Sequence, residues 1–307
     1  MSKKNYKLPT TNYKLVVILG PTASGKTGLS IKLAKKFKGE VISADSRQVY
    51  KGLDIGSGKI TKKEMAGIPH YLLDVANPKT RFTVVQYQKL ALKAIKKIRA
   101  KNKLPIIVGG TGFYIQSIVD GTVIPEVKPD WRLRTKLSSQ PLSELIKQLT
   151  ALDPIRAGNI DQNNPRRVIR ALEIALKTGK AVPKLIVGCP TSHNSILQIG
   201  IKKSPIELKN LIHKRLMKRL KHDAMIKEVK KLYSSGISWK RLEEFGLEYR
   251  FVAQYLQNRL TRQEMVNKIQ IESEHYAKRQ MTWFKRDKLI KWINSYKKAE
   301  KLTKNFL

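Results

Sequence analysis

The sequence predicts an α/β protein with a parallel sheet at its core and an all-α subdomain inserted into it. The run LVVILG at 15–20 is short and wholly apolar, as expected of a strand buried on both faces, and it leads directly into a glycine-rich turn. The run LPIIVGG at 104–110 repeats this arrangement. From Trp131 to Thr178 the apolar residues follow helical spacing without a strand-like run, which indicates the helical insertion.

The other elements follow from the spacing of apolar residues and from turn signals. The helix after the first glycine-rich turn should run from Gly25 to about Lys38, with its amino end directed at the turn. The remaining expected elements, in chain order, are a second strand at 40–46, a crossover helix at 83–100, a helix from Thr111 or Gly112, a strand at 195–201, long basic helices from Pro205 and a last strand at 287–295.

The change of pattern after Gly121 sets the expected domain boundaries. The segment TVIPEVKPD that follows is rich in proline and irregular, so it should connect the sheet to the insertion. We therefore expect a sheet-containing core formed by residues 1–124 and 186–307, with a helical insertion at 125–185. A chain of 307 residues is long enough for this arrangement.

The glycine-rich turn GPTASGKT at 20–27 matches the P-loop pattern GxxxxGK[ST]. In this pattern backbone amides and a Lys surround a diphosphate, and the final hydroxyl binds Mg²⁺. The second expected strand ends in Asp45 and Ser46, and in a parallel sheet the carboxyl ends of the strands face the ligand. These features predict a P-loop NTPase-like core. Most such loops bind ATP or GTP, so the motif alone leaves the owner of the diphosphate open.

The net charge of +39, from 62 Lys and Arg against 23 Asp and Glu, favours a polyanionic partner, with RNA as the leading candidate. The alternative is a compositional bias, since most of the excess is Lys scattered over expected helix faces. The single cysteine, Cys189, excludes a disulfide framework and a cysteine-built zinc site. We find no signal peptide, and no apolar run approaches the roughly 18 residues of a membrane span. We expect a cytoplasmic protein that does not enter membranes.

Six stretches occur in an order that resembles one family, the tRNA dimethylallyltransferases, which alkylate the adenine 3′ of the anticodon. The chain lacks the Cys/His zinc finger of eukaryotic members, so it is more similar to the bacterial type. It departs from the family pattern in EFGLEYR, where Glu248 stands in place of the usual Gly, which leaves the RNA contacts of that segment open. The matching stretches are GPTASGKT at 20, ISADSRQVYKGLDIGSGK at 42, GIPHYLLDV at 67, VGGTGFYIQSIVDG at 108, NNPRRVIRALEIALKTGK at 163 and KRQMTWFKR at 278.

The resemblance implies that the loop binds dimethylallyl diphosphate with Mg²⁺, and that the dimethylallyl group is transferred to N6 of adenosine 37 in tRNAs that read codons beginning with U. Such an enzyme is expected to be a monomer that contacts the anticodon stem-loop. Thr27 would bind the Mg²⁺. Arg215 and Arg219, four residues apart on the helix after Pro205, would reach the diphosphate or the RNA. The residues expected around the diphosphate are Gly20, Pro21, Thr22, Ala23, Ser24, Gly25, Lys26, Thr27 and Arg219.

The catalytic residues implied by the resemblance are Lys26, Thr27, Asp45 and Thr111. The exocyclic amine of adenine is a weak nucleophile and needs a proton acceptor, which Asp45 would provide or orient. Alternatively, Asp45 assists Mg²⁺ or caps a helix. Thr111 would face Asp45 and hydrogen-bond the reacting group, and its position also suits the N-cap of the following helix.

The expected tRNA contacts are basic and polar residues near the strand ends, in the insertion and near the carboxyl terminus. The alternatives are a solvated basic helix for the insertion arginines, and core positions for Met281 and Phe284 in KRQMTWFKR. The predicted contacts are Asp45, Ser46, Arg47, Gln48, Thr111, Arg132, Arg166, Arg167, Arg170, Lys278, Arg279 and Gln280.

Two other functions are compatible with a P-loop. A kinase for a small metabolite or nucleotide would use the same loop for ATP, although such kinases usually carry an arginine-rich lid and not a long helical insertion. A non-catalytic RNA-binding protein with a vestigial loop is the third hypothesis. The intact Lys26, Thr27, Asp45 and Thr111 argue against it.

Overall fold

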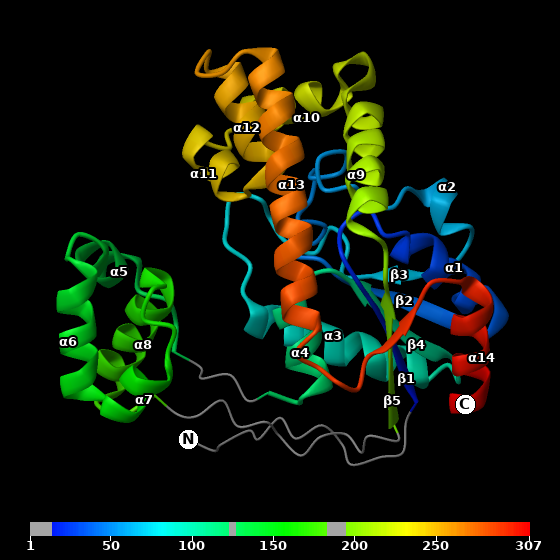
Figure 1. The fold of residues 1–307 in the computed structure, drawn as a ribbon, viewed down its shortest axis with the longest axis horizontal. Helices are drawn as coiled ribbons and strands as arrows, with labels where there is room; N and C mark the ends of the chain where they lie inside the picture. Colours follow the sequence, from blue (N-terminus) through cyan, green and yellow to red (C-terminus); the bar gives the residue numbers. More distant parts are fainter. Residues whose placement is uncertain (1–13, 123–126, 183–194) are drawn as a thin grey trace. The chain divides into compact units, whose positions relative to one another are not determined.

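The computed structural model describes residues 14–122, 127–182 and 195–307 (Figure 1). Contacts along the chain divide it into two compact units. One unit is formed by Met1–Gly121 together with Cys189–Leu307, and the other by Thr122–Gly188. Each unit is described separately below.

The first unit is built on a six-stranded sheet in the order β3-β2-β4-β1-β5-β6, in which every neighbouring pair is parallel. The predicted α/β class with a parallel sheet is therefore confirmed. The last strand is shorter than expected, and β3 at the edge of the sheet was not anticipated. The strands are β1 (Leu15–Leu19), β2 (Gly39–Ala44), β3 (His70–Tyr71), β4 (Leu104–Gly109), β5 (Ile196–Ile201) and β6 (Lys291–Ile293).

Burial on both faces explains why the central strands are continuous apolar runs. In β1 all five side chains are fully buried, and they alternate between two cores. Leu15, Val17 and Leu19 pack in the core that includes α3 (Val84–Arg99) and α4 (Gly112–Val119). Val16 and Ile18 pack in the core that includes α1 (Lys26–Lys36) and α14 (Tyr296–Phe306). The sheet is thus covered by helices on both faces.

The helices α1 and α3 match their predicted positions to within two residues at each end. α1 ends at Lys36, earlier than expected, because Lys38 adopts a left-handed φ of 49° as the chain turns into β2. α3 begins with a capping box between Thr83 and Gln86. The short α2 (Lys62–Met65) and the terminal α14 were not anticipated.

A group of five helices follows β5 in the first unit. Figure 1 shows α9 and α13 side by side, running from the sheet toward α10, α11 and α12. Capping fixes the starts of both long helices: Ser204 accepts a hydrogen bond from the amide of Glu207 in α9, and Thr261 and Glu264 form a capping box in α13. The bounds are α9 (Pro205–Leu220), a 3₁₀ turn (Lys221–Asp223), α10 (Ala224–Ser234), α11 (Trp239–Glu244), α12 (Leu247–Leu256) and α13 (Arg262–Phe284).

The described residues of the second unit form four helices around a core of its own, α5 (Trp131–Ser138), α6 (Leu142–Leu152), α7 (Pro154–Asn159) and α8 (Pro165–Thr178). The side chain of Glu173 is fully buried and binds two arginines. Arg134 donates two hydrogen bonds to it, at 3.0 and 2.7 Å, and Arg170 donates another. The backbone amide of Asp130 is a further donor at 2.6 Å. Glu173 therefore ties α5 to α8.

None of the helices formed by the described residues has both the length and the apolar composition needed to cross a membrane.

At the amino-terminal end of β2, the fully buried carboxylate of Glu40 binds three side chains. The Nζ atoms of Lys103 and Lys101 lie 2.8 and 3.1 Å from its oxygens, and the Tyr71 hydroxyl donates at 2.6 Å. Burial alone would raise the pKa of Glu40, but the hydrogen bonds from Lys103, Tyr71 and Lys101 outweigh it and lower the pKa to about 2. This cluster stabilises the edge of the sheet opposite the strand ends discussed below.

Replacing Glu40 with Gln should lower the free energy of unfolding by about 2 kcal/mol at pH 7. Because the folded pKa is depressed from 4.5 to about 2, the stabilisation is present above pH 4.5 and is lost as the pH falls toward 2. Urea unfolding of the protein and of Glu40→Gln at pH 7 and pH 3 measures this, and the difference between them should shrink at pH 3. An equal difference at both pH values would contradict it. Glu207 forms a largely exposed ion pair with Lys203, so Glu207→Gln should lower the free energy of unfolding by less.

Candidate active site

The turn at 20–27 connects β1 to α1 and has the geometry of an anion-binding loop. Gly20 and Gly25 adopt φ angles of 149° and 90°, which side chains disfavour. A Cβ on Gly20 would also lie 3.0 Å from the carbonyl oxygen of Ile201. α1 starts at Lys26 without a side-chain cap, so its first amides and the positive end of its dipole are directed at the loop.

The Lys26 ammonium folds back onto this loop. Its Nζ donates to the carbonyl oxygens of Gly20 and Pro21, at 2.9 and 2.7 Å. Burial and the nearby charge of Arg215 lower the pKa of Lys26, Asp45 opposes the shift, and the net pKa is about 7. The Ser24 hydroxyl is buried and has no hydrogen-bond partner within the described part of the chain. A cation held by carbonyls and an unpaired buried hydroxyl are both suited to a phosphate ligand.

Arg215 of α9 contacts the loop by donating a hydrogen bond to the Thr22 hydroxyl. Burial and the neighbouring charge of Arg219 together lower the pKa of Arg215 to about 10. Arg219 itself donates to Glu248 at 2.8 Å and to the Gly56 carbonyl at 3.0 Å. Of the two α9 arginines expected to reach the diphosphate or the RNA, Arg215 is thus the one that contacts the loop. The diphosphate role of Arg219 stays a prediction.

Asp45 follows β2 and is half-buried. Its Oδ1 accepts hydrogen bonds from the amides of Arg47 at 2.8 Å and Gln48 at 3.3 Å, which fixes the carboxylate in a tight turn. Both donors use Oδ1, and among the described residues no hydrogen-bond donor reaches Oδ2. The backbone of the turn therefore orients the carboxylate.

Thr111 follows β4, the strand adjacent to β2. It occupies the N-cap position of α4, yet its side chain makes no capping hydrogen bond. Its Oγ1 accepts instead from the amide of Ser46 at 3.0 Å, which brings the two strand ends together. The N-cap interpretation therefore describes its position but not the function of its hydroxyl.

Tyr276 of α13 was missed by the sequence analysis. Burial and the charge of Asp45 raise its pKa to about 12, and it shares a side-chain hydrogen bond with Thr111. The phenol is therefore neutral at pH 7 and lies close to Asp45. Its spacing from Gln280 and Trp283, i, i+4 and i+7 on one helix face, is the sequence signal that marks this residue.

Arg47 and Gln48, which are predicted to contact the RNA, form hydrogen bonds with other parts of the protein. The Gln48 amide accepts from the Ser43 hydroxyl at 3.1 Å and donates to the Gly58 carbonyl at 3.2 Å. Arg47 donates through Nε to the carbonyl of Phe245. These contacts connect residues 45–48 with the loop that precedes α2 and with α11.

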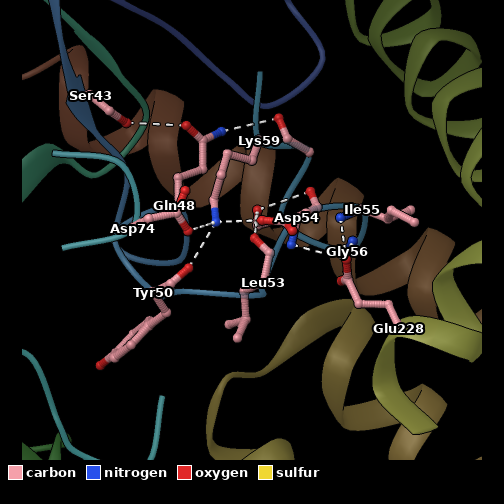
Figure 2. Close-up of polar contacts among 12 residues, drawn as sticks. Ser43, Gln48, Tyr50, Leu53, Asp54, Ile55, Gly56, Lys59, Asp74 and Glu228 are labelled. Atoms are coloured by element: carbon pink, nitrogen blue, oxygen red, sulfur yellow. Dashed lines mark hydrogen bonds and ion pairs between the residues drawn. The ribbon is translucent and has the colours of Figure 1, made fainter. Parts of the chain in front are cut away.

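Figure 2 shows how that loop is fixed. The carboxylate of Glu228 accepts hydrogen bonds from three consecutive amides, of Asp54, Ile55 and Gly56, at 3.0, 2.6 and 3.0 Å. Lys59 is buried beneath the loop, where it binds Asp54 and Asp74 and donates to the Tyr50 carbonyl at 2.8 Å. These contacts hold the loop beside Gln48, which donates to its Gly58 carbonyl.

In KRQMTWFKR the polar residues have different surroundings. Lys278 and Arg279 are exposed, whereas Gln280 is buried and bound to the protein backbone. Phe284 lies in the core, as the alternative interpretation held, and Met281 is half-buried. Gln280 thus has little access to solvent, and its RNA contact stays a prediction.

The insertion arginines also divide into two groups. Arg132, Arg166 and Arg167 are exposed in the second unit. Arg170 is half-buried. It donates hydrogen bonds to the Glu173 carboxylate and, at 3.0 Å, to the carbonyl oxygen of Val127. Arg170 thus has a structural function within its own unit. The other three are exposed, although Arg167 pairs with the exposed Asp161 at 3.3 Å.

The described residues contain no group of three or more His, Cys, Asp or Glu side chains that could hold a metal ion. Thr27 is the last residue of the 20–27 turn, the phosphate loop, and is exposed at the first turn of α1. Mg²⁺ usually keeps several waters and binds through few protein ligands together with substrate phosphates. A magnesium–diphosphate complex fits this donor set because the phosphates would supply most of the ligands.

The family model described as IPP transferase matches residues 48–287. The chain is 40% identical over 300 residues to the tRNA dimethylallyltransferase of Acetivibrio thermocellus, with 95% of each protein covered. It is 41% identical over 275 residues to tRNA dimethylallyltransferase 2 of Shewanella sediminis, with 90% of each covered.

Solved structures of tRNA-modifying transferases are also similar to this protein. The full-length tRNA isopentenylpyrophosphate transferase of Bacillus halodurans is similar with a TM-score of 0.69 and 36% identity, over 95% of this chain and 94% of that one. A eukaryotic dimethylallyltransferase described as acting on tRNA gives a TM-score of 0.73 at 28% identity, over 89% of this chain and 70% of that one. The protein belongs to the IPP transferase family, which confirms the resemblance found in the sequence.

The low pKa of Lys26 predicts that pyrophosphate binding weakens as the pH rises above 7. A bound anion raises the pKa of the ammonium, so binding above pH 7 requires proton uptake. Calorimetric titration of the protein with magnesium pyrophosphate between pH 7 and 9 measures this. The Lys26→Arg variant is the control, because the arginine stays charged over this pH range while the pyrophosphate ionises as before. Its affinity for pyrophosphate should therefore fall less steeply with pH than that of the unmodified protein. Equal slopes would show that Lys26 does not titrate on binding.

Proposed function

We propose that this protein transfers a dimethylallyl group from dimethylallyl diphosphate to N6 of adenosine 37 in tRNA, releasing diphosphate. Membership of the IPP transferase family supports this proposal. The single observation that carries it is the placement of the phosphate loop, Thr111 and Asp45 at the ends of the three adjacent strands β1, β4 and β2. This arrangement can hold a diphosphate beside a proton acceptor.

The phosphate loop would stabilise the leaving diphosphate. Negative charge grows on its oxygens as the bond to the allylic carbon breaks, and preorganised donors lower the energy of that state. The Lys26 ammonium, the Arg215 guanidinium and the first amides of α1 are the donors in reach. Mg²⁺ held through Thr27 would add further charge stabilisation when bound.

Asp45 would accept the proton of the attacking amine. Its Oδ1 is fixed by two backbone amides, so the carboxylate is oriented before substrate arrives. The nitrogen attacks the allylic carbon as the carbon–oxygen bond to diphosphate breaks, and the proton on nitrogen passes to the carboxylate. Thr111 and the neutral phenol of Tyr276 lie beside this position and would orient the adenine.

The exposed cations would bind the tRNA. Lys278 and Arg279 on the first unit, and Arg132, Arg166 and Arg167 on the second, offer charge to the phosphates of an anticodon stem-loop. The adenine must leave its stack to reach Asp45, which costs less for an unpaired loop base. We further propose that the enzyme acts as a cytoplasmic monomer on tRNAs that read codons beginning with U.

The kinase hypothesis requires ATP in the same loop. The relatives described above are named for isopentenyl or dimethylallyl transfer, which favours the prenyltransferase. An assay separates the two functions. The protein is incubated with Mg²⁺, unmodified tRNA and either dimethylallyl diphosphate or ATP, and the digested nucleosides are weighed by mass spectrometry. An adenosine heavier by one C5H8 unit, formed only with the prenyl donor, is the expected result. No mass change together with ATP consumption would support the kinase.

Asp45→Asn should lower kcat by about 10²–10⁴-fold while tRNA affinity stays unchanged. The Asn oxygen still accepts from the amides of Arg47 and Gln48, so the turn is preserved, but the side chain is no longer a base at neutral pH. Single-turnover prenylation and a tRNA binding titration measure the two quantities. A variant with near-normal kcat would remove Asp45 from the mechanism.

A further inference from the structure

We propose that Gln280 is a positioning residue that fixes the phosphate loop relative to the turn carrying Thr111, an inference that rests on the proposed function. Gln280 lies on α13 and is only 6% exposed. Its Oε1 accepts from the Thr22 amide at 2.8 Å, and its Nε2 donates to the Gly110 carbonyl at 2.8 Å. One buried side chain thus connects the turns that follow β1 and β4.

The glycines of the second turn make room for this contact. A Cβ on Gly110 would lie 2.2 Å from the Nε2 of Gln280, and a Cβ on Gly112 would lie 2.3 Å from the ring of Trp283. A Cβ at position 112 would force the Trp283 ring to move, and a Cβ at position 110 would push the Gln280 amide out of its contact with the turn. Gly110 and Gly112 of VGGTG thus allow the close approach of α13.

The contact has a consequence for catalysis. Gln280 binds the phosphate loop at Thr22 and the β4 turn at Gly110, immediately before Thr111. It therefore sets how far the diphosphate lies from the Thr111 and Asp45 side of the site. Because the rate of a bimolecular transfer depends on alignment of the reacting atoms, a displacement of about 1 Å costs on the order of 100-fold.

The test variant is Gln280→Met, which keeps a long unbranched side chain in the buried space but removes both hydrogen bonds. Gln198→Met is the matched control, because Gln198 is equally buried, at 5% exposure, and donates to Asp287 outside the site. Lys278→Ala is a second comparison, since it removes an exposed charge two residues away on the same helix. Thermal unfolding, steady-state prenylation with both substrates varied, and calorimetric binding of magnesium pyrophosphate without tRNA are measured for all variants.

We expect Gln280→Met to lower kcat at least tenfold and to weaken pyrophosphate binding, with the KM for tRNA within twofold of the unmodified protein. Gln198→Met should lower the melting temperature without changing kcat, and Lys278→Ala should raise the KM for tRNA. A Gln280→Met protein with normal kcat, or one altered only in the KM for tRNA, would overturn the proposal.

Two further comparisons keep the outcome interpretable. If Gln280→Met does not fold, Gln280→Glu retains the acceptor for the Thr22 amide and loses the donor to Gly110. It should also lose kcat and pyrophosphate affinity, and normal values for both would overturn the proposal. If the unmodified protein fails to prenylate tRNA, the proposed function fails, whereas the pyrophosphate titration still tests the effect of Gln280 on the loop.

Discussion

The pairing of β4 with both β1 and β2 is the constraint on which the candidate site depends. Gly109 stands opposite Leu19 on one side and Ala44 on the other, so three parallel strands end in the same register. The residues that follow, the phosphate loop, Thr111 and Asp45, must then emerge at one edge of the sheet. A larger residue does not fit at position 109, because a Cβ there would lie 2.1 Å from the Ala44 carbonyl oxygen.

The cations Lys26 and Arg215 lie close together at this edge of the sheet, and the pKa of each is lowered. Burial and the charge of Arg215 lower the pKa of Lys26. Arg219, by contrast, forms an ion pair with Glu248. Glu248 is the residue at which the sequence departs from the family pattern, and in the structure it fixes Arg219 beside the Gly56 carbonyl. Close cations with depressed pKa values are stabilised by an anion, so the electrostatics of the loop favour a diphosphate ligand.

The sheet and the phosphate loop could be predicted from the sequence because their signals are local. A buried parallel strand is a continuous apolar run, and the loop is a fixed pattern of eight residues. Contacts across long sequence separations could not be predicted this way. Gln280 binds Thr22 across 258 positions, and Tyr276 reaches Thr111 from a helix that starts at Arg262. Likewise, Arg170 and Arg166 look alike in sequence, and only the fold shows that a buried Glu173 holds Arg170.

The most direct test of the account is a crystal structure with Mg²⁺ and dimethylallyl thiolodiphosphate, an analogue whose carbon–sulfur bond resists cleavage. The account predicts both phosphates within residues 20–27, with the Lys26 Nζ moved from the carbonyls of Gly20 and Pro21 to a phosphate oxygen. The allylic carbon should face Asp45. A diphosphate bound elsewhere, or a Lys26 that keeps its carbonyl contacts beside the bound analogue, would contradict the assignment of the loop.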